Sequence, residues 1–574
     1  HYMFNKKKIL ILFFLVSILF AYKGAFKSFF ITKKDLLGAQ NVFGISFSNE
    51  ELDTLRPYLE RNLKGYKKMR GYPLGIDVEP ITKFEIKYTK KTNLKDNKIY
   101  LEKTLVPEKD KDIAYLPVYK LAYLIKNQLL TSERLTKIYL RRLKKHNTSL
   151  NVLVTLTEDL ALKQAKKADE EIKKGDYKGA LHGIPYGVKD LASHPNYPTT
   201  WGAAPYKDQY IKTKAVVIKK LEDAGAVLLG KLSSGALARG DVWFGGKTKN
   251  PWNLEYSSGG SSGGTSAALA SGMIPLGTGS DGGGSIRIPA AIGGLSGIKT
   301  SQGRIPIGGT TPPGSGLLTV KGPMARTTMD SALALDATVG PDPTDIFSLE
   351  GRNLKWAQQL SEELPQTAIW SPTMGFSKVD KEVLNVCEKA ISELQNAGVN
   401  IIEKETIWED NPVDSWMVFW ASACARRQQH LVGTSEYEKI DPLLRMFIEM
   451  GMNMDGAAYA SSIDACHKLG YQLEEVFKQS PLIITPATCG QAPKIEGEGY
   501  VNGEETPAWV DFTMGINMTR NPAGVIPAGI LESGMPVALQ IIGGQREDLA
   551  VLKAMHAFES VLDFNHKASD HENK

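Results

Sequence analysis

Hydrophobic residues recur with a helical spacing along most of the chain, and short apolar runs follow several of these stretches. Helices are predicted from Leu129 to Lys145 and from Glu158 to Lys174. Residues 213–223 and 381–396 have the same pattern, and in both an Ala-Gly pair ends the helix before an apolar run typical of a strand. Helices that alternate with buried strands predict an α/β fold, with one large domain over residues 117–566.

The N-terminal part has a different pattern. Lysines at residues 6–8 precede an apolar run over residues 9–22, which is shorter than the roughly 17–25 residues of a membrane-spanning helix. This arrangement predicts an export signal or a short membrane anchor within residues 1–32, with a buried hydrophobic helix as the alternative. Residues 33–116 are rich in Lys, Glu and Tyr and are interpreted as a helical accessory segment, and residues 567–574 as a flexible tail.

Composition and charge exclude several classes of protein. Of the 574 residues, 42% are hydrophobic and 23% charged, which is ordinary for a globular protein and excludes collagen, a coiled coil and wholesale disorder. A net charge of +6 is small for this length, so no nucleic-acid partner is expected. The cysteines lie far apart without a CxxC pair, which argues against a disulfide framework and a structural zinc site.

One stretch, residues 257–297, combines serines with the highest glycine density in the chain. It contains Gly-Gly-Ser-Ser-Gly-Gly at 259–264 and Asp-Gly-Gly-Gly-Ser-Ile-Arg at 281–287. Glycines allow backbone N–H groups to converge on a negative group, at an entropic cost. The candidates are a phosphate and the oxyanion of a reaction intermediate.

Short patterns within this stretch admit other interpretations. Residues 277–282 match GxGxxG, but without the strand–turn–helix setting of a dinucleotide site. Residues 259–263 match the GxSxG elbow of α/β hydrolases around Ser261, which requires a downstream acid and histidine. The downstream histidines have no recognisable context: His430, His467 and His556.

A lysine motif further upstream favours a different chemistry. Residues 182–190 read His-Gly-Ile-Pro-Tyr-Gly-Val-Lys-Asp and place Lys189 after a short apolar run. Ser261 and Ser285, each next to glycine, lie 24 positions apart. This combination resembles the amidase signature family, whose members hydrolyse amides with a Ser–Ser–Lys triad. The resemblance covers about three quarters of the chain and includes further motifs in order, at residues 250–253, 297–300, 303–306 and 536–543.

The resemblance implies a fold and three catalytic roles. The fold is a single large domain with a mixed, twisted β-sheet flanked on both sides by helices, preceded by a helical extension. Lys189 matches the general base, Ser261 the bridging serine whose preceding peptide bond is cis, and Ser285 the nucleophile. An ordinary lysine is protonated at neutral pH, so Lys189 must be buried to act as a base. Asp190 would oppose this if it pointed inward, so it is expected to pair elsewhere.

The backbone just before the nucleophile is expected to form the oxyanion hole. By resemblance, its N–H donors are three consecutive glycines: Gly282, Gly283 and Gly284. Supporting roles are expected for a hydrogen-bonding serine and for an ion pair around the loop: Ser262, Asp281 and Arg287. The resemblance implies neither a metal ion nor a cofactor.

The expected function is hydrolysis of a linear carboxylic amide, in a small molecule or a peptide, through an acyl-enzyme intermediate. One alternative is the A subunit of a glutamine-dependent tRNA amidotransferase, which the export-like N-terminus disfavours; another is an inactive binding protein on the same scaffold. The aromatic run at residues 415–420 either packs against the core or lines an acyl pocket. The chain is expected to be exported or membrane-anchored rather than cytoplasmic, with membrane association through residues 9–22 and a homodimer left open.

Overall fold

The computed structural model describes residues 31–70, 101–308, 318–351 and 354–568, which fall into two compact units. The first unit comprises residues 31–70 and the second comprises the described residues from 101 onward. The predicted signal or anchor, including the apolar run at residues 9–22, lies outside the described residues. Within the described ranges, no helix is both long enough and apolar enough to cross a bilayer.

The first unit consists of helices α2 (Lys33–Phe43) and α3 (Asn49–Arg70). A capping box starts α2, in which the Thr32 hydroxyl accepts from the Asp35 N–H and the Asp35 carboxylate accepts from the Thr32 N–H. The helix ends at Gly44, whose φ of 65° is left-handed. This unit confirms the predicted helical extension.

The predicted accessory segment ends later in the sequence than the structural unit does. Ile113 and Ala114 have no exposed surface and belong to the core of the second unit. The Tyr139 hydroxyl donates to the Ala114 carbonyl oxygen at 3.0 Å. Residues 101–116 therefore pack with the large unit. At the other end, Ala568 is buried, so the packed chain continues two residues past the predicted boundary at 566.

A mixed sheet of 11 strands forms the centre of the large unit, in the order β1-β3-β2-β6-β8-β7-β14-β15-β11-β9-β10. The strands β2, β3 and β6 are parallel, as are β9, β10 and β11, whereas the other pairs are antiparallel. The strands are β1 (Leu153–Leu156), β2 (Pro185–Lys189), β3 (Val227–Leu232), β6 (Leu276–Asp281), β7 (Ser296–Lys299), β8 (Val320–Ala325), β9 (Thr367–Trp370), β10 (Asn400–Glu403), β11 (Leu482–Pro486), β14 (Ala523–Ile530) and β15 (Pro536–Gly543).

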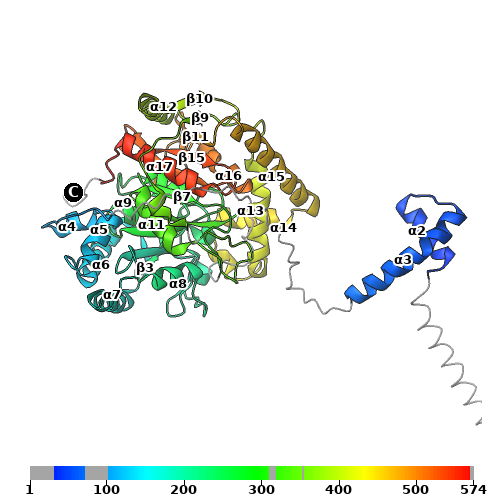
Figure 1. The fold of residues 1–574 in the computed structure, drawn as a ribbon, viewed down its shortest axis with the longest axis horizontal. Helices are drawn as coiled ribbons and strands as arrows, with labels where there is room; N and C mark the ends of the chain where they lie inside the picture. The colour runs from blue at the N-terminus through cyan, green and yellow to red at the C-terminus, as the bar shows by residue number, and fades with distance from the viewer. Residues whose placement is uncertain (1–30, 71–100, 309–317, 352–353, 569–574) are drawn as a thin grey trace, which may run out of the picture. The chain divides into compact units, whose positions relative to one another are not determined.

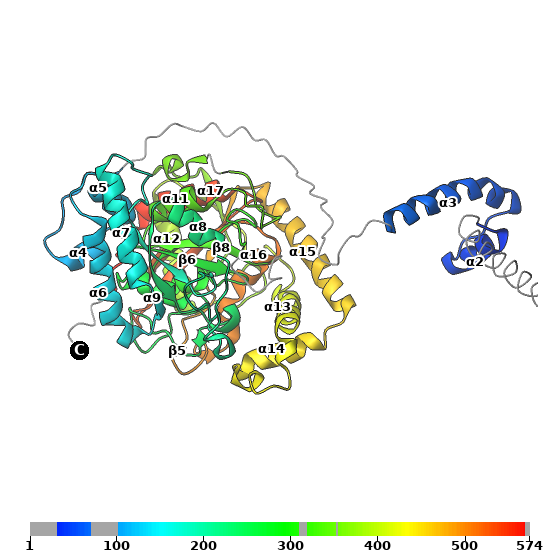
Figure 2. The same cartoon turned by 90° about the horizontal axis from the view of Figure 1, so that it is seen from below.

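Helices surround this sheet in both views of the molecule (Figure 1, Figure 2). They are α4 (Asp110–Ala114), α5 (Val118–Lys126), α6 (Ser132–Leu150), α7 (Glu158–Lys173), α8 (Val216–Asp223), α9 (Gly263–Ala270), α10 (Arg287–Ile292), α11 (Thr328–Thr338), α12 (Lys381–Asn396), α13 (Val413–Gln428), α14 (Pro442–Met452), α15 (Gly456–Phe477), α16 (Met514–Met518) and α17 (Asp548–Leu562). The predicted α/β fold with a mixed sheet and flanking helices is confirmed.

Neighbouring residues of β6 show that helices cover both faces of the sheet. A side chain at Gly277 would collide with Thr265 of α9, whereas Thr278 lines a cavity together with Val217 of α8 and Ala334 of α11. Successive residues of a strand point to opposite faces. The glycine-rich helix α9 therefore lies on one face of the sheet, and α8 and α11 lie on the other.

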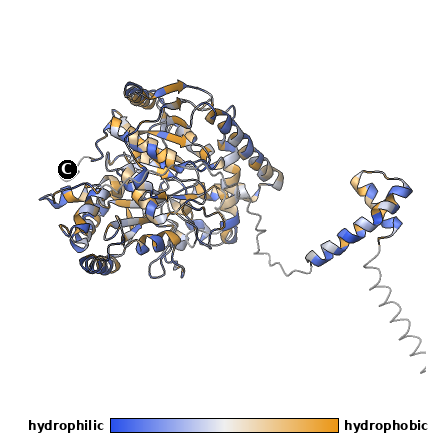
Figure 3. Cartoon of the chain, in the orientation of Figure 1, coloured by the Kyte–Doolittle hydropathy of each residue, from blue (hydrophilic) through white to orange (hydrophobic). Residues whose placement is uncertain are grey.

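The predicted helix–glycine–strand units are present with small shifts at their ends. Helix α12 begins after Asp380, whose carboxylate accepts from the N–H groups of Glu382 and Val383, and a glycine with positive φ, Gly398, follows it. Its buried residues recur at the spacing of one helical face: Val383, Cys387, Ala390, Ile391 and Leu394. Figure 3 shows both hydrophilic and hydrophobic segments along this helix, as its amphipathic pattern requires.

Candidate active site

Lys189 and Ser280 meet at the carboxyl edge of two neighbouring strands. Lys189 is the last residue of β2, and Ser280 lies near the end of β6, which runs parallel to β2. The carboxyl ends of adjacent parallel strands lie at the same edge of a sheet, where open α/β sheets place their ligand sites. The Lys189 amine donates to the Ser280 hydroxyl at 3.0 Å. Both side chains are buried.

Ser261 approaches the same amine from the glycine-rich turn that precedes α9. Its Oγ lies 2.7 Å from Lys189 Nζ, and the side chain has no exposed surface. The Gly260–Ser261 peptide bond is cis. A Cβ at Gly260 would lie 1.7 Å from the Gly240 carbonyl oxygen, so no other residue fits there. The close packing of this turn holds the Ser261 hydroxyl against the lysine.

The surroundings of Lys189 favour the uncharged amine. Burial lowers its pKa well below the ordinary lysine value, and the nearby Lys321 lowers it further, while Asp281 acts in the opposite direction. Asp190, the next residue, pairs with Lys231, whose amine lies 2.6 Å from the carboxylate, and accepts from the Thr200 N–H at 3.0 Å. The negative charge of Asp190 is therefore compensated by Lys231 and not by Lys189.

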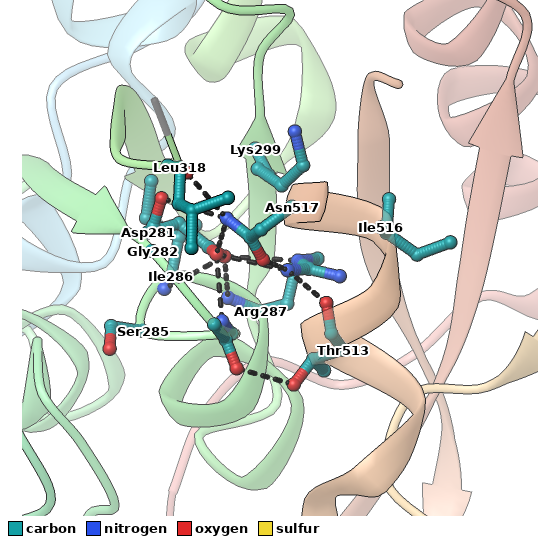
Figure 4. A network of polar contacts seen from close by, with 12 residues as sticks. Asp281, Gly282, Ser285, Ile286, Arg287, Lys299, Leu318, Thr513, Ile516 and Asn517 are labelled. Atoms are coloured by element: carbon teal, nitrogen blue, oxygen red, sulfur yellow. Dashed lines mark hydrogen bonds and ion pairs between the residues drawn. The ribbon is translucent and has the colours of Figure 1, made fainter. Parts of the chain in front are cut away.

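Asp281 and Arg287 form a fully buried ion pair beneath the glycine loop (Figure 4). Two parallel contacts of 2.9 Å join the guanidinium to the carboxylate. Although burial alone would raise the pKa of Asp281, Arg287 holds it well below its usual range. The guanidinium also donates to Gln540 at 2.7 Å and to the Thr513 carbonyl oxygen at 2.8 Å. The pair therefore ties the loop after β6 to residues more than 200 positions away.

Three side chains hold the carbonyl oxygens of the glycine loop. Asn517 donates to the Asp281 carbonyl at 3.0 Å, Trp416 to the Gly282 carbonyl at 2.8 Å and Thr513 to the Gly283 carbonyl at 2.6 Å. The C=O and N–H of one planar peptide unit point in opposite directions. Holding each carbonyl on one side therefore turns the N–H of the following residue to the other side.

The N–H groups of this loop have different partners. The Gly284 N–H donates to the buried Asp281 carboxylate at 2.7 Å. This differs from its predicted place in the oxyanion hole, because the N–H already has an acceptor. Among the described residues, the N–H groups of Gly282, Gly283 and Ser285 have no acceptor. Three neighbouring free donors are thus available to a developing negative charge.

Ser285 is half-buried, and its backbone is fixed by Ser262, a predicted supporting residue. The Ser262 hydroxyl donates to the Ser285 carbonyl oxygen at 2.5 Å, and the Ser262 N–H donates to the same oxygen at 3.3 Å. Within the part of the chain that the structure describes, the Ser285 hydroxyl makes no hydrogen bond, and Figure 4 shows it pointing away from the Asp281–Arg287 network. The structure thus brings Lys189 and Ser261 into contact and leaves the Ser285 hydroxyl unengaged.

Sequence reasoning missed the site roles of three residues, Ser280, Thr513 and Asn517, and the specific contact of Trp416. Ser280 lies five positions before Ser285 in the stretch already singled out, so its place there was the available signal. Trp416 was noted only as part of an aromatic run. Asn517 lies 236 positions from the carbonyl that it holds, and no local pattern points to that contact.

The chain is similar to several known proteins over most of its length. The amidase family model matches residues 134–552. An acylamidase of Rhodococcus erythropolis is 31% identical over 470 residues, which cover 79% of this chain and 96% of that protein. The A subunit of the glutamyl-tRNA(Gln) amidotransferase of Nitrosococcus oceani is 31% identical over 475 residues, which cover 78% of this chain and 97% of that protein. The crystal structure of a bacterial aryl acylamidase of the amidase signature family superposes with a TM-score of 0.72 at 25% identity, covering 78% of this chain and 97% of that one.

Proposed function

The chain belongs to the amidase signature family, and on that premise we propose that it hydrolyses a linear carboxylic amide through an acyl-enzyme formed on Ser285. The observation that carries the proposal is the contact of 2.7 Å between the buried Lys189 amine and the Ser261 hydroxyl. A buried amine that stays uncharged has a lone pair with which to accept a proton. The free N–H groups beside Ser285 supply the second requirement, a binding place for the oxyanion.

The proposed proton path runs from Ser285 through Ser261 to Lys189. The Ser285 oxygen attacks the amide carbonyl carbon, its proton moves to Ser261 Oγ, and the Ser261 proton moves to Lys189 Nζ. Collapse of the tetrahedral intermediate breaks the C–N bond, and the protons return along the same path to the leaving amine. Water then attacks the resulting ester by the same route and releases the acid.

This path requires the Ser285 hydroxyl to turn toward Ser261 when substrate binds. Catalytic hydrogen bonds are often long or absent before the substrate arrives and tighten in the complex. The carbonyl of Ser285 is already held by Ser262, so the backbone of the nucleophile is fixed before its hydroxyl turns. The Lys189 amine donates to Ser280 at 3.0 Å and to Ser261 at 2.7 Å. The path requires the second of these hydrogen bonds to reverse, so that the Ser261 hydroxyl becomes the donor.

The substrate class of the proposal draws on the relatives and on the aromatic run. An acylamidase is among the relatives, and hydrolysis of this kind is chemistry that a single chain can complete. Trp416 and Trp420 of α13 are stacked with ring centroids 5.5 Å apart, and Trp416 contacts the glycine loop. Such aromatic surfaces are typical of the apolar part of a ligand site. An acyl or aryl group beside the scissile amide would suit this surface.

A second candidate function is that of the A subunit in a tRNA amidotransferase. One such protein is as similar in sequence as the acylamidase, at 31% identity. The N-terminal region, with its helical unit at 31–70, lies outside the residues that the family model matches.

We also propose that residues 1–32 direct export or membrane attachment, since lysines precede an apolar run there. Carbonate extraction of membranes from the native source, followed by detection of the full chain, tests that part.

A fluorophosphonate probe tests the proposed chemistry. Covalent labelling of a single peptide containing Ser285, abolished by Ser285→Ala, is the expected result, together with turnover of at least one amide in a panel of aryl, fatty-acyl and peptide amides. A folded protein that neither reacts with the probe nor turns over any amide would contradict the proposal in favour of a binding role. Copurification of partner subunits with ammonia transfer, but without free hydrolysis, would instead establish the amidotransferase role.

A further inference from the structure

A second buried lysine lies on the face of the sheet opposite α9, close to the proposed base. A small cavity between the sheet and helices α8 and α11 is lined by both Lys189 and Lys321. The other side chains at its wall are apolar or weakly polar: Val217, Leu221, Leu276, Ala334 and Thr338. The two lysines therefore border one poorly solvated space, where charges interact more strongly than in water.

The strand register places Lys321 beside the hydrogen-bond partner of Lys189. Lys321 lies on β8 directly opposite Ser280 of the antiparallel strand β6. Residues in this position share a face, with Cβ atoms about 4.5–5.5 Å apart. Ser280 accepts a hydrogen bond from Lys189 at 3.0 Å. Lys321 is thus the cross-strand neighbour of the residue that binds the amine of the proposed base.

No carboxylate compensates the charge of Lys321 within the described residues. Its amine takes part in no ion pair and donates no hydrogen bond there. The acidic groups near Lys189 are committed elsewhere, Asp281 to Arg287 and Asp190 to Lys231. Helices α8 and α11 contribute no charged side chain to the cavity wall. A proton on Lys321 would therefore repel a proton on Lys189 without an intervening anion.

We propose that Lys321 is a positioning residue for the reaction, whose positive charge keeps Lys189 unprotonated near neutral pH. This inference rests on the proposed function of Lys189 as the base. Burial lowers the pKa of Lys321 to about 8, which still leaves it mainly charged at pH 7. Burial lowers the pKa of Lys189 well below the ordinary lysine value, and Lys321 lowers it in addition. A charged Lys321 thus disfavours a proton on the neighbouring Lys189, which stays free to accept one.

The pH dependence of probe labelling tests the inference. The rate of fluorophosphonate reaction at Ser285 is measured from pH 5.5 to 9.5 in the wild type and in Lys321→Met, Lys321→Arg and Thr338→Val. The labelling rate is expected to fall on the acidic side of the pH–rate profile, where Lys189 becomes protonated. Removal of the charge in Lys321→Met should move the midpoint of this acidic limb upward by about one pH unit and retain the plateau rate at high pH. Lys321→Arg keeps the charge and should keep the wild-type limb, and Thr338→Val, at the same cavity wall, should leave it unmoved.

The outcomes separate this inference from the proposed function. A Lys321→Met limb that superposes on that of the wild type, in a protein with unchanged melting behaviour, overturns the role of Lys321 but leaves the proposed function intact. If Lys321→Met does not fold, Lys321→Gln provides the same loss of charge with a polar side chain, and the same upward shift is expected. A wild type that is not labelled at Ser285 at any pH overturns both. Equal shifts in Lys321→Met and Thr338→Val would assign the effect to cavity packing and also overturn it.

Discussion

The indole N–H of Trp416 donates to the carbonyl oxygen of Gly282, 134 residues earlier in the chain, at 2.8 Å. This bond joins helix α13 to the loop that precedes Ser285. Because the Gly282 carbonyl and the Gly283 N–H belong to one peptide plane, the bond also sets the direction of a proposed oxyanion donor. A Cβ at Gly283 would lie 2.5 Å from the indole ring, so the ring and the loop fit together only with glycine there.

Trp416→Phe should lower kcat while leaving KM nearly unchanged. The variant keeps an aromatic ring but loses the donor, so the Gly283 N–H is no longer held in place. Loss of one oxyanion donor costs about 10²–10³ in kcat, and a donor that is only misdirected should cost about 10-fold. Trp420→Phe is the matched control, because the buried Trp420 indole N–H has no partner among the described residues. Equal kcat losses in the two variants would contradict the role given to the Trp416 bond.

Lys189→Met should abolish turnover and remove a pH dependence of stability. In the folded protein the pKa of Lys189 is lowered, whereas in the unfolded chain it is near 10.4, so between these values only the unfolded state binds the proton. The free energy of unfolding of the wild type should therefore rise with pH across that window, by up to about 1.4 kcal/mol per pH unit from this group. Urea unfolding of both proteins from pH 7 to 9.5 measures the difference in slope, and parallel slopes would show that Lys189 is charged in the native state.

Asp281→Asn should destabilise the protein and inactivate it together. Removing one partner of a buried ion pair leaves the other charge uncompensated and costs about 3–5 kcal/mol. The change also replaces one acceptor oxygen by an NH2 group that faces backbone and guanidinium N–H donors, which loosens the loop before Ser285. Asp548→Asn is the control, since Asp548 forms a buried pair with Arg304 at 2.9 Å outside the site. Urea unfolding and kcat are measured for both, and the control should lose stability but keep its kcat under native conditions.

Ser280→Ala should lower kcat/KM by about 10-fold. The variant leaves one N–H of the buried Lys189 amine unpaired, which costs about 1–3 kcal/mol, and the amine is then free to turn away from Ser261. Ser280→Thr retains the hydroxyl and should recover the rate to within about 3-fold of the wild type, a difference of less than about 1 kcal/mol. Steady-state kinetics on one amide, with melting temperatures as a check of folding, distinguish the variants. A Ser280→Ala enzyme as fast as the wild type would remove Ser280 from the site.

Much of the fold could be predicted from local patterns. The helices at 158–173 and 381–396 follow from the spacing of their apolar residues, and glycines with positive φ, such as Gly398, mark their ends. Local patterns did not reveal that Ile113 and Ala114 belong to the core of the large unit, because their burial depends on partners far along the chain. Such distant partners cannot be identified from the local composition.

The site divides in the same way. Lys189, Ser261 and Ser285 stand in short motifs, so the sequence points to them directly. The contact between Lys189 and Ser261 forms because the turn before α9 packs against the end of β2. The engagement of the Gly284 N–H by Asp281 does not follow from any motif. It depends on the exact course of a loop that Trp416, Thr513 and Asn517 hold from distant elements.

The sequence by itself determined the alternation of helices and strands and the types of residue that meet at the glycine-rich loop, since both are written in neighbouring positions. Only the tertiary structure decided which amides of that loop remain free and which lysine lies opposite Ser280. Those features depend on strand order and register, and the free energy that selects them comes from packing between segments separated by tens to hundreds of residues.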